Sequence, residues 1–152
     1  MNNYEAPNAN VESAVVDFKP VRGVIYSMLI AIVGVSIFSL MASIVAIVVS
    51  GVSFIDEEAV DAVLSQNVLF MVVDAIGSMV LLVLAGRVLA KYVPEKETSF
   101  SLIVTVLVLC VYGSTFVYVE GAFSSFPIWY NVASILSLFV GIPIGARLGS
   151  KA

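Results

Sequence analysis

Residues 24–49 read VIYSMLIAIVGVSIFSLMASIVAIVV, a run of 26 amino acids without a charged side chain. At about 1.5 Å of rise per residue, a helix of this length extends roughly 39 Å, more than the ~30 Å hydrocarbon core of a bilayer. The apolar core of a cleaved signal peptide has only about 7–15 residues. The run therefore predicts a retained membrane-spanning helix that tilts or protrudes from the hydrocarbon layer.

Three further apolar segments follow, and they predict spans at about residues 67–89, 100–119 and 129–146. The chain is 61% hydrophobic and 12% charged, whereas a soluble domain is about half apolar and a quarter charged. A globule of 152 residues is too small to bury such an excess. We therefore predict an all-α, polytopic membrane protein in which residues 23–149 form a bundle of four transmembrane helices.

The basic residues all lie on one side of these four segments. The connections after the first and third segments contain no Lys or Arg and carry acidic residues instead. Basic residues close to a span resist translocation and stay in the cytoplasm. Both termini are therefore predicted to be cytoplasmic, with residues 1–22 as a polar, disordered tail. The seven basic residues are Lys19, Arg22, Arg87, Lys91, Lys96, Arg147 and Lys151.

Several classes of function lack the residues that they require. The chain has no His and a single Cys, Cys110, which excludes an internal disulfide and the usual ligand sets of zinc and haem. It has no Gly-x-Ser-x-Gly elbow and no paired carboxylates within a span, so no catalytic residue, metal or cofactor is expected and an enzyme is disfavoured. No basic patch for nucleic acid is present. The lipid bilayer is the partner that the composition implies.

Asp74 is the only acidic or basic residue deep within an apolar segment. An Asp near the centre of a span costs about 2.5–3.5 kcal/mol on insertion scales, so a compensating contact is expected. The spacing of Asn67, Asp74 and Ser78 places them on one polar helix face that should point into the bundle. We predict a candidate proton or ion site there. The alternative is a carboxyl that only forms hydrogen bonds with Ser, Asn or Tyr on neighbouring helices.

Small residues recur at helical spacing in the first and fourth spans. Such residues let two helices approach closely, and their hydroxyls can donate hydrogen bonds across the contact. Helix packing is the favoured interpretation, and the lining of a polar pathway is the alternative. The predicted packing residues are Ser36, Ser39, Ser43, Ala46 and Ser50 in the first span, and Ser137, Gly141 and Gly145 in the fourth.

Residues suited to the membrane surface mark the ends of the spans. Trp129 and Tyr130 open the fourth span, where amphipathic rings prefer the headgroup layer. Arg87, Lys91 and Arg147 follow the second and fourth spans, where long cationic side chains extend toward the headgroups. We predict these five residues to be interfacial anchors.

The acidic stretch at residues 50–66 contains apolar residues at helical spacing. Acidic residues in a first turn interact favourably with the helix dipole, and Ser53 or Asp56 is suited to be the N-cap. The stretch predicts a short amphipathic helix on the outer surface or an extension of the second span.

Three short motifs are similar to those of a group of known proteins. They are residues 3–9 (NYEAPNA), residues 85–90 (AGRVLA), and a fourth segment that opens with Trp129 and ends in residues 145–148 (GARL). With this layout the chain resembles small four-span inner-membrane proteins of proteobacteria. The resemblance implies a location in the bacterial inner membrane and no particular activity.

Three functions remain open at this level. The leading hypothesis is a non-catalytic subunit or accessory factor that packs against another membrane protein or against itself. It depends on the small-residue stripes and on the lack of catalytic residues. The alternative is a small oligomeric transporter, coupled to protons or ions through Asp74. The third is an immunity protein against a pore-forming bacteriocin, which would act by binding the helices of a partner protein.

Overall fold

The computed structural model describes residues 18–118 and 125–151, with only the backbone at residues 116 and 117. Most of the predicted tail and residue 119 of the predicted third span lie outside the described residues. The prediction of an all-α fold is confirmed, since the regular elements of the described residues are all helical. These elements are α1 (Pro20–Met28), η1 (Leu29–Gly34), α2 (Val35–Ser50), α3 (Glu57–Gln66), α4 (Val68–Tyr92), α5 (Glu97–Tyr118) and α6 (Ile128–Gly149).

Four helices are long and apolar enough to cross a membrane, which confirms the predicted four-helix membrane protein. The first of them, Pro20–Ser50, consists of α1, η1 and α2 in direct succession and has 31 residues. It begins at Pro20, within the segment predicted as tail, because proline is favourable in the first turn, where no N–H partner is needed. Its η1 segment is a π-helix, a rare local widening of an α-helix.

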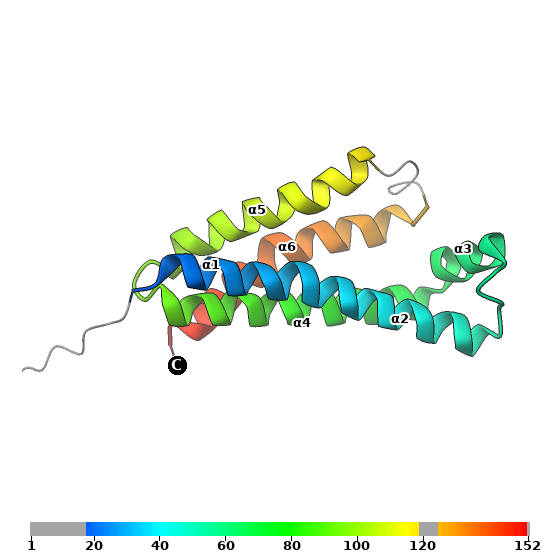
Figure 1. Ribbon diagram of the computed structural model, residues 1–152, viewed down its shortest axis with the longest axis horizontal. Helices are drawn as coiled ribbons and strands as arrows, with labels where there is room; N and C mark the ends of the chain where they lie inside the picture. Colours follow the sequence, from blue (N-terminus) through cyan, green and yellow to red (C-terminus); the bar gives the residue numbers. More distant parts are fainter. Residues whose placement is uncertain (1–17, 119–124, 152) are drawn as a thin grey trace, which may run out of the picture.

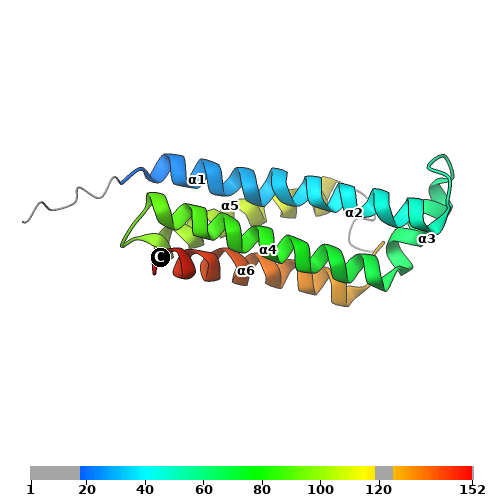
Figure 2. The same ribbon diagram turned by 90° about the horizontal axis from the view of Figure 1, so that it is seen from below.

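The four long helices alternate in direction (Figures 1 and 2), so the start of α1 and the end of α6 lie at the same end of the bundle. The α4–α5 connection is at this end, and α3 is at the opposite one. All seven basic residues belong to the first end, which we call the basic end. The distribution of positive charge predicts that the basic end faces the cytoplasm and that the other end, the outer end, does not.

Helix α4 lies at the centre of the bundle, with α6 on one side and α1–α2 on the other (Figure 2). Glycines bring α4 and α6 together. A Cβ atom added to Gly86 would lie 2.0 Å from the carbonyl oxygen of Ile142, and one added to Gly145 would lie 2.0 Å from that of Val83. The backbones of the two helices are therefore almost in contact, which is the packing that small residues permit in a membrane.

Helix α5 packs in the bundle mainly through the residues that are nearer the basic end. Val104 and Val108 are fully buried there, whereas Val111 is 40% exposed and Thr115 is exposed. Figure 1 shows the outer end of α5 leaning away from α2 and α4. A pocket lined by residues of α2, α4, α5 and α6 lies at this part of the bundle.

The acidic stretch between α2 and α4 forms the separate helix α3, which is one of the two alternatives that the sequence left open. Asp56 is its N-cap, and Asp56 Oδ1 accepts a hydrogen bond of 3.1 Å from the Ala59 N–H. Asn67 has an extended conformation and ends α3, and its Oδ1 accepts a 3.0 Å bond from the Phe70 N–H as the N-cap of α4. Two caps in succession explain why α3 is not a continuation of the second span.

Candidate functional site

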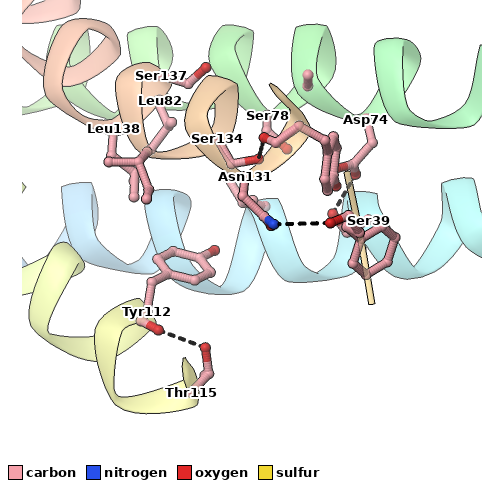
Figure 3. Close-up of a pocket in the computed structure, with 15 residues that line it drawn as sticks. Ser39, Asp74, Ser78, Leu82, Tyr112, Thr115, Asn131, Ser134, Ser137 and Leu138 are labelled. Carbon is pink, nitrogen blue, oxygen red and sulfur yellow. Dashed lines mark hydrogen bonds between the residues drawn. The ribbon is translucent and has the colours of Figure 1, made fainter. Parts of the chain in front are cut away.

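A cavity of about 270 Å³ lies in the outer half of the bundle between α2, α4, α5 and α6. We call it the Asp74 cavity (Figure 3). Nine of the fifteen residues that line it have polar side chains, although most of the surface that they present to the cavity is apolar. The polar lining residues are Ser39, Asp74, Ser78, Tyr112, Thr115, Tyr130, Asn131, Ser134 and Ser137.

Asp74 connects three helices at one wall of this cavity. Its side chain is only 4% exposed. Ser39 of α2 donates a hydrogen bond to Asp74 Oδ1, and Tyr130 of α6 donates one of 2.5 Å to Oδ2. These hydroxyls are the compensating contacts that an acid within a span requires. An ionised carboxylate has about four acceptor positions, so capacity for further donors remains.

Tyr130, which the sequence predicts to be an interfacial anchor, also contacts Asp74. Its hydroxyl donates a hydrogen bond to the Asp74 carboxyl. Asp74 lies near the outer end of α4 and Tyr130 in the first turn of α6, so the two residues are at similar depth. The neighbouring Trp129 is 44% exposed and packs against the Tyr130 ring in a T-shaped contact at 5.9 Å. Trp129 therefore keeps the exposure expected of an anchor.

Of the two residues predicted to accompany Asp74, only Ser78 lines the cavity. The prediction was wrong for Asn67, which lies two helical turns away and does not line it. The Asn67 side chain is used as the N-cap of α4 instead. The reason is physical: the first N–H groups of a helix lack partners within it, and Asn is among the residues best suited to accept from them.

The predicted packing residues of the first span differ in how deeply they are buried. Ala46 is buried in the bundle, and Ser39 and Ser43 are half-buried. Ser43 donates its hydroxyl to the Ser39 carbonyl of its own helix, at 2.8 Å. Ser36 and Ser50 are exposed. The Ser36 side chain nevertheless forms a hydrogen bond with Tyr112 of α5, so it makes a contact between two helices.

Two of the three predicted packing residues of α6 lie in a helix contact. Gly141 and Gly145 face Leu82 and Val83 of α4. Ser137, one turn closer to the outer end, lines the Asp74 cavity. The predicted anchors at the basic end, Arg87, Lys91 and Arg147, are exposed.

Sequence reasoning missed Asn131 as a residue of the cavity, whereas Tyr112 is one of the tyrosines on neighbouring helices that it considered near Asp74. Asn131 is 5% exposed, and its Nδ2 donates to the Phe126 carbonyl at 3.3 Å. Figure 3 shows its side chain pointing toward Ser39. Tyr112 of α5 donates its hydroxyl to the Ala31 carbonyl in η1, at 3.3 Å. A signal for Asn131 was its position on the same helix face as Ser134 and Leu138, at spacings of three and four.

The cavity therefore combines one carboxyl, several hydroxyls, an amide and aromatic rings. Within residues 18–118 and 125–151, no three His, Cys, Asp or Glu residues gather where they would share a metal ion. Comparison with protein-family models, with curated proteins and with solved structures gave no match. Any function must consequently be argued from the geometry of the cavity.

Proposed function

We propose that this integral membrane protein is a small proton- or ion-coupled carrier in which Asp74 takes up the coupling ion. One observation carries the proposal. The single acid in the interior of the spans is buried at the wall of a cavity, and it is held there by hydroxyls from two other helices. An acid of this kind within a membrane is the usual mark of an ion or proton pathway.

The chemistry of coupling follows from the surroundings of Asp74. None of the residues that line the cavity is Lys or Arg, and all seven basic residues belong to the basic end. A buried carboxylate without a basic partner is costly, so it is stable either when protonated or when a cation lies beside it. Exchange between these two states at one carboxyl couples a proton to a second cation.

Further polar groups lie between the cavity and the basic end. The hydroxyls of Ser27 in α1 and Thr105 in α5 are buried and form no hydrogen bond within the part of the chain that the structure describes. Both residues belong to the halves of their membrane spans that are nearer the basic end. Buried hydroxyls of this kind are places where water or a polar solute binds. They support a route through the bundle.

Proton flux into liposomes that contain the purified protein tests this proposal. The liposomes are loaded with sodium or n-butylammonium and diluted into a medium without it, and a pH-sensitive dye in the lumen reports the proton uptake that exchange for the outgoing cation drives. We expect Asp74→Asn to reduce the protein-dependent rate at least tenfold, because the amide cannot exchange a proton. Asp61→Asn, a change at an exposed acid of α3, is the matched control and should leave the rate unchanged. Equal rates in the wild type and Asp74→Asn would remove Asp74 from the mechanism.

A second candidate function is that of a membrane subunit or accessory factor. The observation that favours it is that Thr115, which lines the cavity at the outer half of α5, is exposed. Polar groups facing lipid are unfavourable, so a helix of another membrane protein or of a second copy would stabilise this opening. Purification from native membranes in mild detergent separates the candidates. A stoichiometric partner supports the subunit, and a chain that purifies alone contradicts it.

We propose that the protein functions in the bacterial inner membrane. Support comes from the resemblance of its sequence motifs and from the concentration of positive charge at the end where α1 begins and α6 ends. Fractionation of the membranes of a producing bacterium by density tests the location.

A further inference from the structure

We infer that the Asp74 cavity binds a small organic ammonium ion. The transport of this ion rests on the carrier function proposed above, whereas its binding rests on the cavity alone. Three properties of the cavity carry the inference: one negative group with free acceptor positions, aromatic and aliphatic walls, and a small volume.

The negative group is Asp74. Its two oxygens each accept one hydroxyl, from Ser39 and from Tyr130. About two of the four acceptor positions of the carboxylate then remain for N–H donors. Because no basic side chain lines the cavity, the positive charge that neutralises the carboxylate must come with the ligand. A protonated amine supplies both the charge and the donors.

The walls of the cavity distinguish an organic cation from a metal ion. Tyr112, Phe126 and Tyr130 contribute aromatic rings, and Leu82 and Leu138 contribute aliphatic surface. The face of an aromatic ring attracts a cation, and aliphatic walls favour its hydrocarbon part. Hard metal ions instead need several oxygen ligands, commonly with more than one carboxylate. Asp74 is the only carboxylate among the residues that line this cavity.

The volume and the opening of the cavity limit the size of the ligand. Its volume of about 270 Å³ is close to the lower end of the roughly 300–1,000 Å³ found for ligand pockets. The exposed Thr115 at its rim leaves an entrance beside the outer half of α5. We therefore infer a small amine, which enters from the outer half of the membrane.

Calorimetric titration of the full-length protein in lipid nanodiscs tests the site directly. The probes are n-butylammonium, sodium and the neutral 1-pentanol, each corrected with empty nanodiscs. We expect saturable binding of n-butylammonium, at least tenfold tighter than that of 1-pentanol. Asp74→Asn should weaken it at least tenfold, and Asp61→Asn in α3 should not change it. Binding that is equal in the wild type and Asp74→Asn would overturn the inference.

A second variant keeps the test informative if Asp74→Asn does not fold. Ser134→Leu fills the cavity from α6 and leaves Asp74 in place, so it should also weaken n-butylammonium binding at least tenfold. Unchanged binding in this variant would place the ligand elsewhere and contradict the proposed site.

The outcomes separate this inference from the carrier function. Sodium binding without n-butylammonium binding overturns the ligand class and leaves an ion-coupled carrier standing. Asp74-dependent proton flux without amine binding likewise overturns the ligand class and leaves the carrier function standing. Amine binding in a protein that moves neither protons nor amine into liposomes supports the site and overturns the carrier function.

Discussion

At the scale of single residues, the contact between Tyr130 and Asp74 determines how an acid is accommodated within the bundle. Tyr130→Phe removes the donor to Asp74 Oδ2 and preserves the ring that packs on Trp129. Buried acceptors that lose a partner destabilise proteins by about 1–3 kcal/mol, but hydrogen bonds within membranes average nearer 0.6 kcal/mol. We expect a loss of about 1 kcal/mol in the free energy of unfolding, measured by titration with a denaturing detergent.

Tyr118→Phe is the matched control for this prediction, because it removes the same hydroxyl from a side chain that is 84% exposed. The control should change the free energy of unfolding by less than about 0.5 kcal/mol. If both variants lose equal stability, the Tyr130 hydroxyl has no special contact with Asp74.

The sequence indicated that Asp74 needs a partner, but it could not identify one. Insertion energetics depend on one residue and its depth, and both are readable from a hydropathy pattern. The partners are 35 and 56 positions away, so they depend on the rotation and register of three packed helices. Asn67 was assigned to the site on helical spacing alone, and the competing requirement for an N-cap prevailed.

At the scale of elements, the glycine contact between α4 and α6 should be the most sensitive packing in the bundle. In Gly145→Ala, the new Cβ would lie 2.0 Å from the Val83 carbonyl oxygen, a backbone atom that cannot turn aside. Overpacking costs about 1–3 kcal/mol and sometimes more, so we expect a loss of at least 2 kcal/mol of stability. The thermal midpoint of helix loss, followed by circular dichroism in detergent, measures it.

Gly113→Ala provides the control for this effect. A Cβ at this position of α5 would have no neighbour within 4 Å. Alanine is about 1 kcal/mol more favourable than glycine within a helix, so this variant should be as stable as the wild type or more stable. A destabilised Gly113→Ala together with an unaffected Gly145→Ala would contradict the observed packing of α4 and α6.

The N-cap of α3 gives a third prediction. Asp56→Ala removes the acceptor of the Ala59 N–H and should destabilise α3 by about 1 kcal/mol. Amide hydrogen exchange at residues 59–62 should then become roughly five times faster, since 1 kcal/mol corresponds to about that factor. Asp61→Ala, which removes an exposed carboxylate in the middle of the same helix, should have a smaller effect. Equal acceleration in both variants would exclude a capping role for Asp56.

The sequence predicted the number of spans, because hydropathy is a local property, and it predicted helix at residues 57–66 without deciding whether this helix is separate from the second span. It missed the π-helical segment η1 and the role of Gly86, which appears only when α6 is placed against α4. It also predicted a packing stripe that includes Ser36 and Ser50, both of which are exposed. Regular spacing predicts a shared helix face, but the neighbouring helices determine how much of that face is covered.

At the scale of the whole molecule, the charge distribution predicts the orientation in the membrane. In a Cys110→Ala background, a cysteine at the exposed Ser53 should react from outside intact cells with a membrane-impermeant maleimide. A cysteine at Ser150, at the basic end, should react only after the membrane is permeabilised. The reverse pattern of labelling would place the basic end outside and contradict the topology.

The central claim is that Asp74 binds the ion whose charge the protein moves. Currents from liposomes adsorbed on a solid-supported membrane test it most directly, because they record charge displacement after a rapid jump in n-butylammonium or proton concentration. We predict a saturable transient current with the wild type and with Asp61→Asn, and none with Asp74→Asn. A current of equal size in Asp74→Asn, or no current with any of the three proteins, would contradict the claim.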